Sequence, residues 1–375
     1  MQILNVEKLK DNINEIARYD LENHKIFGSG YMVMQQGKVV YKHYFGYAST
    51  NQKELDDRTI FRLASMTKPM SAIATLILVE RGMLALEDEV SKFIPEYQNV
   101  RITKVENGEL VDYGPAKTPI TIRHLLTHTS GIGSLEIKKF DFLTVEDKKT
   151  ASNLSRRYAQ MGVDFEPTSR EAYSGVAAFS VLGRIMEQMI GENLQDFYAK
   201  EIFEPCGMQD TTFIPTQDQW ARVIDMHTCD QDGNNGVKPM REGCIFEDYP
   251  CRHCLPGAGL VSTLTDYAKF ATMLLNKGKT LTGRIVSENI FNEMSKPQVK
   301  IDTTVSWGLG VRVIADGHPF LSKGSFGWSG AYGSHFWVDP NNEIVAVYMK
   351  NSTVDGGSGN ESARNFESAV NRALL

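Results

Sequence analysis

The stretch that decides the fold is FRLASMTKPMSAIATLILVERG, residues 61–82. A short apolar run leads into an apolar helix, which is expected to end at Gly82 because glycine is common just after helix C-termini. Ser65 and Lys68 stand three positions apart at the start of this helix, so their side chains share one face. Burial lowers the pKa of a lysine, and a neutral amine can take a proton from a serine hydroxyl. The spacing predicts a nucleophilic serine with a lysine beside it, although it also arises by chance roughly once or twice in such a chain.

The bulk composition argues against several classes of partner. The chain has 375 residues, of which 42% are hydrophobic and 23% charged, as in ordinary globular proteins. The formal net charge is −6 and no basic run stands out, so nucleic acids and anionic membranes are not expected as partners. The N-terminus lacks the pattern of a signal peptide, and the longest apolar stretch, 72–79, is too short to cross a bilayer. We expect a cytoplasmic protein with reduced cysteines, whose oligomeric state the sequence leaves open.

Strand signals lie at both ends of the chain, and helix signals lie between them. Helical periodicity over 6–20 places Val6, Leu9, Ile13 and Ile16 on one face. The β-rich runs over 31–49 are expected to form a hairpin. Further strands are expected over 306–314 and 324–352, further helices over 173–191, 259–278 and 361–375, and a loop over 107–118.

This order of elements predicts an α+β fold. The expected architecture is an antiparallel sheet flanked by helices, built from N- and C-terminal segments, with a mostly helical region inserted between them. The sheet domain is expected to comprise residues 1–83 and 255–375, and the inserted region residues 84–254.

Two further motifs complement Ser65. FEPTSREAYSGVAAFSVLG places Tyr173 and Ser174 just before an apolar helix, and FGWSGAYGSHFWVDPNN places a W-S-G triplet, residues 328–330, on a late strand. Together with FRLASMTKPM, these stretches resemble the three motifs of the serine β-lactamase and penicillin-binding-protein superfamily. They look most like class C β-lactamases and the esterases related to them. The phrases TIRHLLTHTSGI, LEDEVSKFIPE and PGAGLVSTLTDYAKF support the resemblance, which spans roughly residues 25–370.

The resemblance implies a β-lactamase/transpeptidase-like fold and a role for each matching residue. Ser65 is implied to be the acylated nucleophile, Lys68 its base or the group that orients the base, and Tyr173 the proton shuttle to the leaving group. The backbone N–H groups of Ser65 and Ala331 are implied to form the oxyanion hole, where each donor contributes about 3 kcal/mol to the transition state. The candidates for substrate binding are Ser174, Trp328, Ser329, Gly330 and His335.

Two departures from the family pattern bear on the substrate. The second motif usually reads Tyr-x-Asn, but Gly175 stands here in place of the asparagine. The third usually begins with a lysine that holds a substrate carboxylate, and Trp328, which stands in its place, cannot pair with an anion. Both departures argue against an efficient β-lactamase, and W-x-G at this point is similar to the esterase branch. We therefore expect a serine hydrolase that cleaves a small ester through a Ser65 acyl-enzyme.

Several alternatives stay open at this point. Within the same chemistry they are a β-lactamase, a D-amino-acid peptidase or amidase, and an enzyme that transfers the acyl group to another alcohol. In each case the partner is a small-molecule ester or amide. From a different class comes a non-catalytic member of the fold that binds ligands or assembles with itself, which the presence of Ser65, Lys68 and Tyr173 disfavours.

No cofactor is expected to be required for catalysis, but one segment carries a metal alternative. Four of the five cysteines lie within residues 229–254. The C-x-x-C spacing of Cys251 and Cys254 is that of a zinc knuckle, and Cys229 and Cys244 can complete a structural four-thiolate site. The other interpretation is a set of reduced, partly buried cysteines in a long loop.

A second pair of residues has metal-binding spacing on a helix. His124 and His128 stand four positions apart in RHLLTHTSG. No third ligand is apparent near them in the sequence, and the family phrase accounts for both as structural residues. We therefore expect no metal there.

Overall fold

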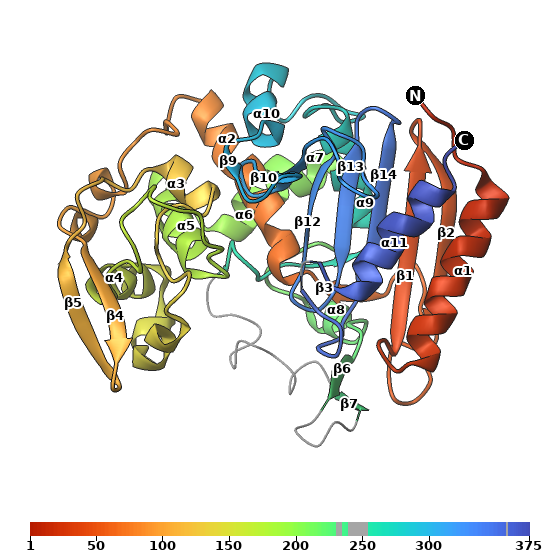
Figure 1. Ribbon diagram of the computed structural model, residues 1–375, viewed down its shortest axis with the longest axis horizontal. Helices are drawn as coiled ribbons and strands as arrows, with labels where there is room; N and C mark the ends of the chain where they lie inside the picture. Colours follow the sequence, from red (N-terminus) through yellow and green to blue (C-terminus); the bar gives the residue numbers. More distant parts are fainter. Residues whose placement is uncertain (230–234, 239–253, 358) are drawn as a thin grey trace.

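The computed structural model describes residues 1–229, 235–238, 254–357 and 359–375. At its centre lies an eight-stranded antiparallel sheet in the order β2-β1-β14-β13-β12-β11-β10-β9 (Figure 1). The strands are β1 (Gly28–Gln35), β2 (Lys38–Gly46), β9 (Val299–Lys300), β10 (Val305–Trp307), β11 (Arg312–Ile314), β12 (Phe326–Ser329), β13 (His335–Asp339) and β14 (Ile344–Lys350). The predicted hairpin is β1–β2, and every strand of this sheet comes from one of the two ends of the chain. The predicted fold class is confirmed, while the division into two domains stays a prediction.

Helices cover both faces of this sheet. α1 (Val6–Glu22) and α11 (Glu361–Arg372) pack side by side over one face (Figure 1). The predicted inner face of α1 is confirmed for Leu9, Ile13 and Ile16, whereas Val6, in the first turn, is 42% exposed. On the opposite face, α9 (Leu264–Leu275) contacts β13 and β14.

Because side chains alternate across a sheet, consecutive residues of a strand contact the helices on opposite faces of the sheet. The Trp337 ring lies 5.0 Å from the Phe366 ring of α11. The neighbouring Phe336 ring lies on the other side, 4.9 Å from the Tyr267 ring of α9. The same alternation determines which residues of the W-S-G strand can reach Ser65.

A separate pair of short strands leads into the helix of the opening motif. β3 (Ile60–Arg62) pairs antiparallel with β8 (Val261–Thr263). A single 3₁₀ turn over Ala64–Thr67 follows, and α2 (Lys68–Glu80) continues from it. Gly82 has φ 68° just past the helix end, as predicted for a residue that ends a helix.

The middle of the chain is mostly helical, as expected, and lies beside the sheet (Figure 1). The predicted helix over 173–191 is α5 (Ala177–Ile190), which begins three residues after Ser174. The other α-helices of this region, among the described residues, are α3 (Ile122–Leu126), α4 (Ala151–Met161), α6 (Leu194–Tyr198), α7 (Glu204–Cys206) and α8 (Gln217–Trp220), and α10 (Glu288–Ser295) follows α9. A two-stranded pair, β6 (Met226–Cys229) with β7 (Asn235–Lys238), follows α8.

One expectation for this region is wrong. Residues 107–115 of the predicted loop belong to an antiparallel hairpin of β4 (Arg101–Glu106) and β5 (Glu109–Pro115), and only residues 116–118 lack regular structure. Asn107 and Gly108 have φ values of 51° and 81°. Two successive positive φ values define the two-residue turn whose twist matches a hairpin, and Asn-Gly is its preferred sequence.

The described residues contain no helix that is both long enough and apolar enough to cross a bilayer. The cytoplasmic location stays a prediction.

Candidate active site

Ser65 lies in the tight turn between β3 and α2, and it is 9% exposed. The residue before it, Ala64, has φ 44°. A residue with a Cβ pays about 1 kcal/mol or more for this left-handed conformation. The turn thus presents Ser65 and its N–H group from a backbone that the surrounding structure holds in place.

Lys68 is fully buried one turn further on. Its Nζ lies 3.2 Å from Ser65 Oγ and donates to the carbonyl oxygens of Gly175 at 2.6 Å and Gly257 at 2.8 Å. Burial lowers the pKa of Lys68, because the charged ammonium loses its hydration in the interior. The predicted contact between the two side chains is present.

Tyr173 lies on the other side of the lysine, in the segment before α5. Lys68 Nζ lies 5.0 Å from the centre of its ring. The Tyr173 hydroxyl accepts a hydrogen bond of 3.3 Å from Trp328 Nε1. The Trp307 ring stacks on the Tyr173 ring, at 5.8 Å and an interplanar angle of 14°. The structure thus brings Ser65, Lys68, Tyr173 and Trp328 together.

The end of β12 closes this arrangement from the sheet side. A Cβ on Gly330 would lie 2.3 Å from the carbonyl oxygen of Leu63, so only glycine lets the two backbones approach this closely. Ala331 follows and is exposed. Within the described part of the chain, the N–H groups of Ser65 and Ala331 donate no backbone hydrogen bond.

Three of the predicted substrate-binding side chains are engaged elsewhere. Ser174 is fully buried, and its Oγ accepts the N–H of Ala178 at 3.0 Å, in the first turn of α5. Ser329 Oγ lies 2.7 Å from His335 Nδ1, and His335 Nε2 lies 2.9 Å from a carboxylate oxygen of Glu367 on α11. Because Ser329 follows Trp328 on a strand, its side chain points to the opposite face of the sheet. The structure does not bring Ser329 and His335 to Ser65.

The structure describes only part of the cysteine-rich segment. Of the four cysteines, Cys244 and Cys251 and the side chain of Cys229 lie outside the described residues, and Cys254 is buried. His124 Nδ1 accepts the N–H of Thr121 at 3.1 Å, which caps α3. Among the described residues, no group of three or more histidine, cysteine or acidic side chains is placed to hold a metal.

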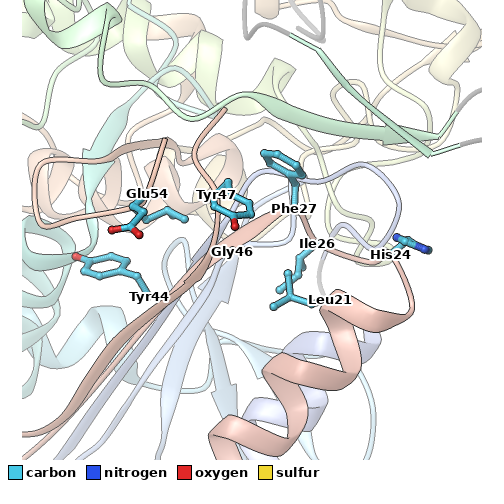
Figure 2. A pocket seen from close by; sticks show the side chains of 9 residues that line it. Leu21, His24, Ile26, Phe27, Tyr44, Gly46, Tyr47 and Glu54 are labelled. Carbon is cyan, nitrogen blue, oxygen red and sulfur yellow. The ribbon is translucent and has the colours of Figure 1, made fainter. Parts of the chain in front are cut away.

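A cavity of about 630 Å³ lies elsewhere, between the end of α1, the start of β1 and the end of β2 (Figure 2). Its lining is mixed, with aromatic side chains such as Phe27 and Tyr47 beside the carboxylate of Glu54. None of the predicted site residues lines it.

Some neighbours of the predicted residues were not anticipated. The carbonyls of Gly175 and Gly257 carry no sequence signal, since every residue has such a group. Trp307 was assigned only to a strand, and its Nε1 donates to Glu171 at 2.9 Å. The sequence singled out His128 only for its metal-binding spacing from His124, whereas the structure places its ring centre 4.6 Å from that of Tyr173.

The fold and the motifs define the class of the protein. The chain belongs to the Beta-lactamase family, whose model matches residues 13–370. It is an enzyme of the serine hydrolase type, as the resemblance of its three motifs implied.

The similarity to individual relatives covers nearly the whole chain. Protein Rv1367c of Mycobacterium tuberculosis is 28% identical over 374 residues, which cover 92% of this chain and 90% of the relative. Esterase EstB of Burkholderia gladioli is 26% identical over 391 residues, with coverage of 95% and 94%. The solved structure of EstCE1, described as a hydrolase with promiscuous acyltransferase activity, superimposes with a TM-score of 0.78. It is 24% identical and covers 97% of this chain and 99% of its own.

Proposed function

We propose that the protein hydrolyses small esters through an acyl-enzyme formed on Ser65. The observation that carries this proposal is the environment of the Lys68 amine. A neutral amine has two N–H donors and one lone pair. The carbonyls of Gly175 and Gly257 take the two donors, at 2.6 and 2.8 Å. The lone pair is then left for the hydroxyl of Ser65, 3.2 Å away.

The proposed reaction begins with proton transfer from the Ser65 hydroxyl to Lys68 as Oγ attacks the ester carbonyl carbon. The N–H groups of Ser65 and Ala331 stabilise the oxyanion of the tetrahedral intermediate. The C–O bond to the alcohol then breaks, and the proton reaches the leaving alkoxide through the hydroxyl of Tyr173. A water molecule attacks the acyl-enzyme by the same route and releases the acid, which restores Ser65 and neutral Lys68.

The aromatic surroundings support an uncharged acyl or alcohol group. Trp307 and Trp328 lie edge to face, with ring centres 4.7 Å apart, and both rings contact Tyr173. The position at which lactamases and peptidases carry a lysine is thus taken by an indole, which offers apolar area but no positive charge. The side chains that we place at the site include no basic group besides the buried Lys68, which the proposal requires to be neutral.

The same chemistry leaves acyl transfer as the second candidate. It differs from hydrolysis only in whether water or an alcohol attacks the acyl-enzyme. EstCE1 is described as a hydrolase that also has acyltransferase activity, whereas EstB is named an esterase. We propose hydrolysis as the main activity, because water needs no binding site of its own.

A panel of substrates tests the proposal. Purified protein is assayed against p-nitrophenyl esters from acetate to octanoate, a chromogenic cephalosporin and D-alanyl-p-nitroanilide. We expect the short esters to be the best substrates in kcat/KM. Faster turnover of the cephalosporin or the D-alanyl amide than of every ester would replace the assignment with a β-lactamase or peptidase. Addition of an alcohol such as butanol, with analysis for butyl esters, measures the acyl-transfer share.

Two controls accompany the panel. Ser65→Ala should abolish ester hydrolysis and labelling by a fluorophosphonate while the melting temperature stays near that of the wild type. A folded Ser65→Ala protein that retains most of the activity would contradict the mechanism. We further propose that catalysis needs no metal, so incubation with EDTA should leave kcat unchanged in protein that stays folded.

A further inference from the structure

His128 lies behind Tyr173, in the turn that follows α3, and it is 1% exposed. We propose that His128 is the positioning residue of Tyr173 and that it acts by holding the backbone on both sides of the tyrosine. This inference rests on the proposed function, because it assigns His128 a role through the proton transfer that we assign to Tyr173.

Two hydrogen bonds form the clamp. The backbone oxygen of His128 accepts the N–H of Ala172 at 2.9 Å. The Nδ1 atom of its ring accepts the N–H of Ser174 at 3.2 Å. The residues immediately before and after Tyr173 are therefore both bound to this one histidine, so the tyrosine backbone cannot rotate without breaking one of the bonds.

The imidazole ring adds a third contact by packing among the aromatic rings of the site. Its centre lies 4.6 Å from that of Tyr173 and 4.4 Å from that of Trp307. Trp307 in turn donates to Glu171, two residues before the tyrosine. His128 thus contacts both the segment 171–174 and Trp307, which is hydrogen-bonded to that segment.

The chemistry of the ring indicates why a histidine is needed for the clamp. Because Nδ1 accepts a hydrogen bond, the proton of the neutral ring is on Nε2. Nε2 is buried and has no hydrogen-bond partner among the described residues, which costs about 1–3 kcal/mol. An apolar side chain would fill the space without this cost. The feature that only the polar ring supplies is the Nδ1 acceptor.

The surroundings also keep the ring in its accepting form. Burial lowers the pKa of His128 well below its ordinary value, because the charged imidazolium loses its hydration in the interior. A protonated imidazole has two donors and no acceptor, and it would lose the bond to Ser174.

Two neutral substitutions separate the clamp from simple packing. In His128→Asn the side-chain oxygen stands the same number of bonds from the backbone as Nδ1, so it can still accept the N–H of Ser174. Asparagine also tolerates the φ of 58° at this position. In His128→Gln the amide lies one bond further out, near the place of Nε2. The pair differs in reach while both side chains stay neutral amides.

The experiment compares kcat and KM of both variants on p-nitrophenyl butyrate, in the wild-type and in the Tyr173→Phe background. We expect His128→Gln to lower kcat by about 100-fold, since a displacement of about 1 Å at a reacting group can cost that much. KM should change less than about threefold, and His128→Asn should retain at least about tenfold more activity than His128→Gln. In the Tyr173→Phe background, His128→Gln should cost less than about threefold.

Equal losses in the two variants, or the same loss with and without the Tyr173 hydroxyl, would overturn the inference. Should His128→Gln fail to fold, ¹⁵N NMR of histidine-labelled wild-type protein provides the second test. We expect His128 as the neutral Nε2–H tautomer, and an Nδ1–H tautomer would overturn the clamp. Full activity of Tyr173→Phe would instead refute the role proposed for the tyrosine, which distinguishes a failure of the proposed function from a failure of the clamp.

Discussion

Replacement of Gly330 by alanine tests the geometry of the proposed oxyanion site directly. The added Cβ would lie 2.3 Å from the backbone oxygen of Leu63, whereas Cβ contacts below 3.0 Å are essentially never observed. The two backbones must therefore separate by at least 0.7 Å. Neither atom is the end of a flexible side chain, so one of the two segments that carry Ser65 and Ala331 must move as a whole.

The size of this movement determines the expected loss of activity. The N–H of Ala331 is one residue from the substituted position, and the N–H of Ser65 is two residues from Leu63. Loss of one oxyanion donor costs about 10²–10³ in rate, and a misplacement of about 1 Å can cost about 10². We expect Gly330→Ala to lower kcat/KM for p-nitrophenyl butyrate by about 100-fold and the rate of fluorophosphonate labelling by a similar factor.

The chain offers a matched control for this change. A Cβ at Gly283 would have no atom within 4 Å, and the backbone there is not left-handed. Gly283→Ala should match the wild type in activity and in melting temperature. If Gly330→Ala were folded and within about threefold of Gly283→Ala in kcat/KM, the oxyanion site would not be formed by this contact, and the assignment of Ala331 would be wrong.

Three further predictions concern pH and stability. Because Lys68 must be neutral to act as a base, kcat/KM should fall as the pH drops below its lowered pKa, and a flat profile from pH 5 to 9 would contradict this role. Burial raises the pKa of the Asp20 carboxyl, so its contribution to stability is complete at low pH and is lost as the pH rises through that pKa. Asp20→Asn should therefore have a higher melting temperature than the wild type at pH 7, and this difference should shrink toward pH 4. A difference in melting temperature that stays constant with pH would show that ionisation of Asp20 is not its cause. Buried Asp164 pairs with Lys139 at 2.7 Å and also accepts the backbone N–H groups of residues 134–136. Lys139→Met should lower the free energy of unfolding in urea by about 3 kcal/mol, whereas a loss below about 1 kcal/mol would show that these N–H groups alone satisfy the carboxylate.

The parts of the site that the sequence predicted well are local ones. The contact between Ser65 and Lys68 depends only on their spacing of three residues in one helical turn, so it could be predicted before the rest of the fold was known. The placement of Trp328 beside Tyr173, by contrast, came from the family resemblance. No spacing rule connects residues 155 positions apart in the chain.

Two errors had signals in the sequence that were not used. The hairpin of β4 and β5 surrounds Asn107-Gly108, the preferred pair for a two-residue turn. Ser329 and Trp328 were both expected at the pocket, yet neighbours on a strand point to opposite faces. The role that we propose for His128 had no such signal, because its bonds to Ala172 and Ser174 depend on tertiary structure.

The proposed nucleophile and its proposed base depend on different levels of this structure. A spacing of three residues in one turn brings Ser65 and Lys68 within reach of each other. The protonation state of Lys68 depends instead on burial among segments that are far apart in the chain, including the carbonyls of Gly175 and Gly257. An exposed lysine has a pKa near 10.4, so only roughly one amine in 2,500 is neutral at pH 7. The S-x-x-K spacing by itself therefore supplies almost no base, and it is the tertiary structure around Lys68 that turns a common sequence pattern into a reactive pair.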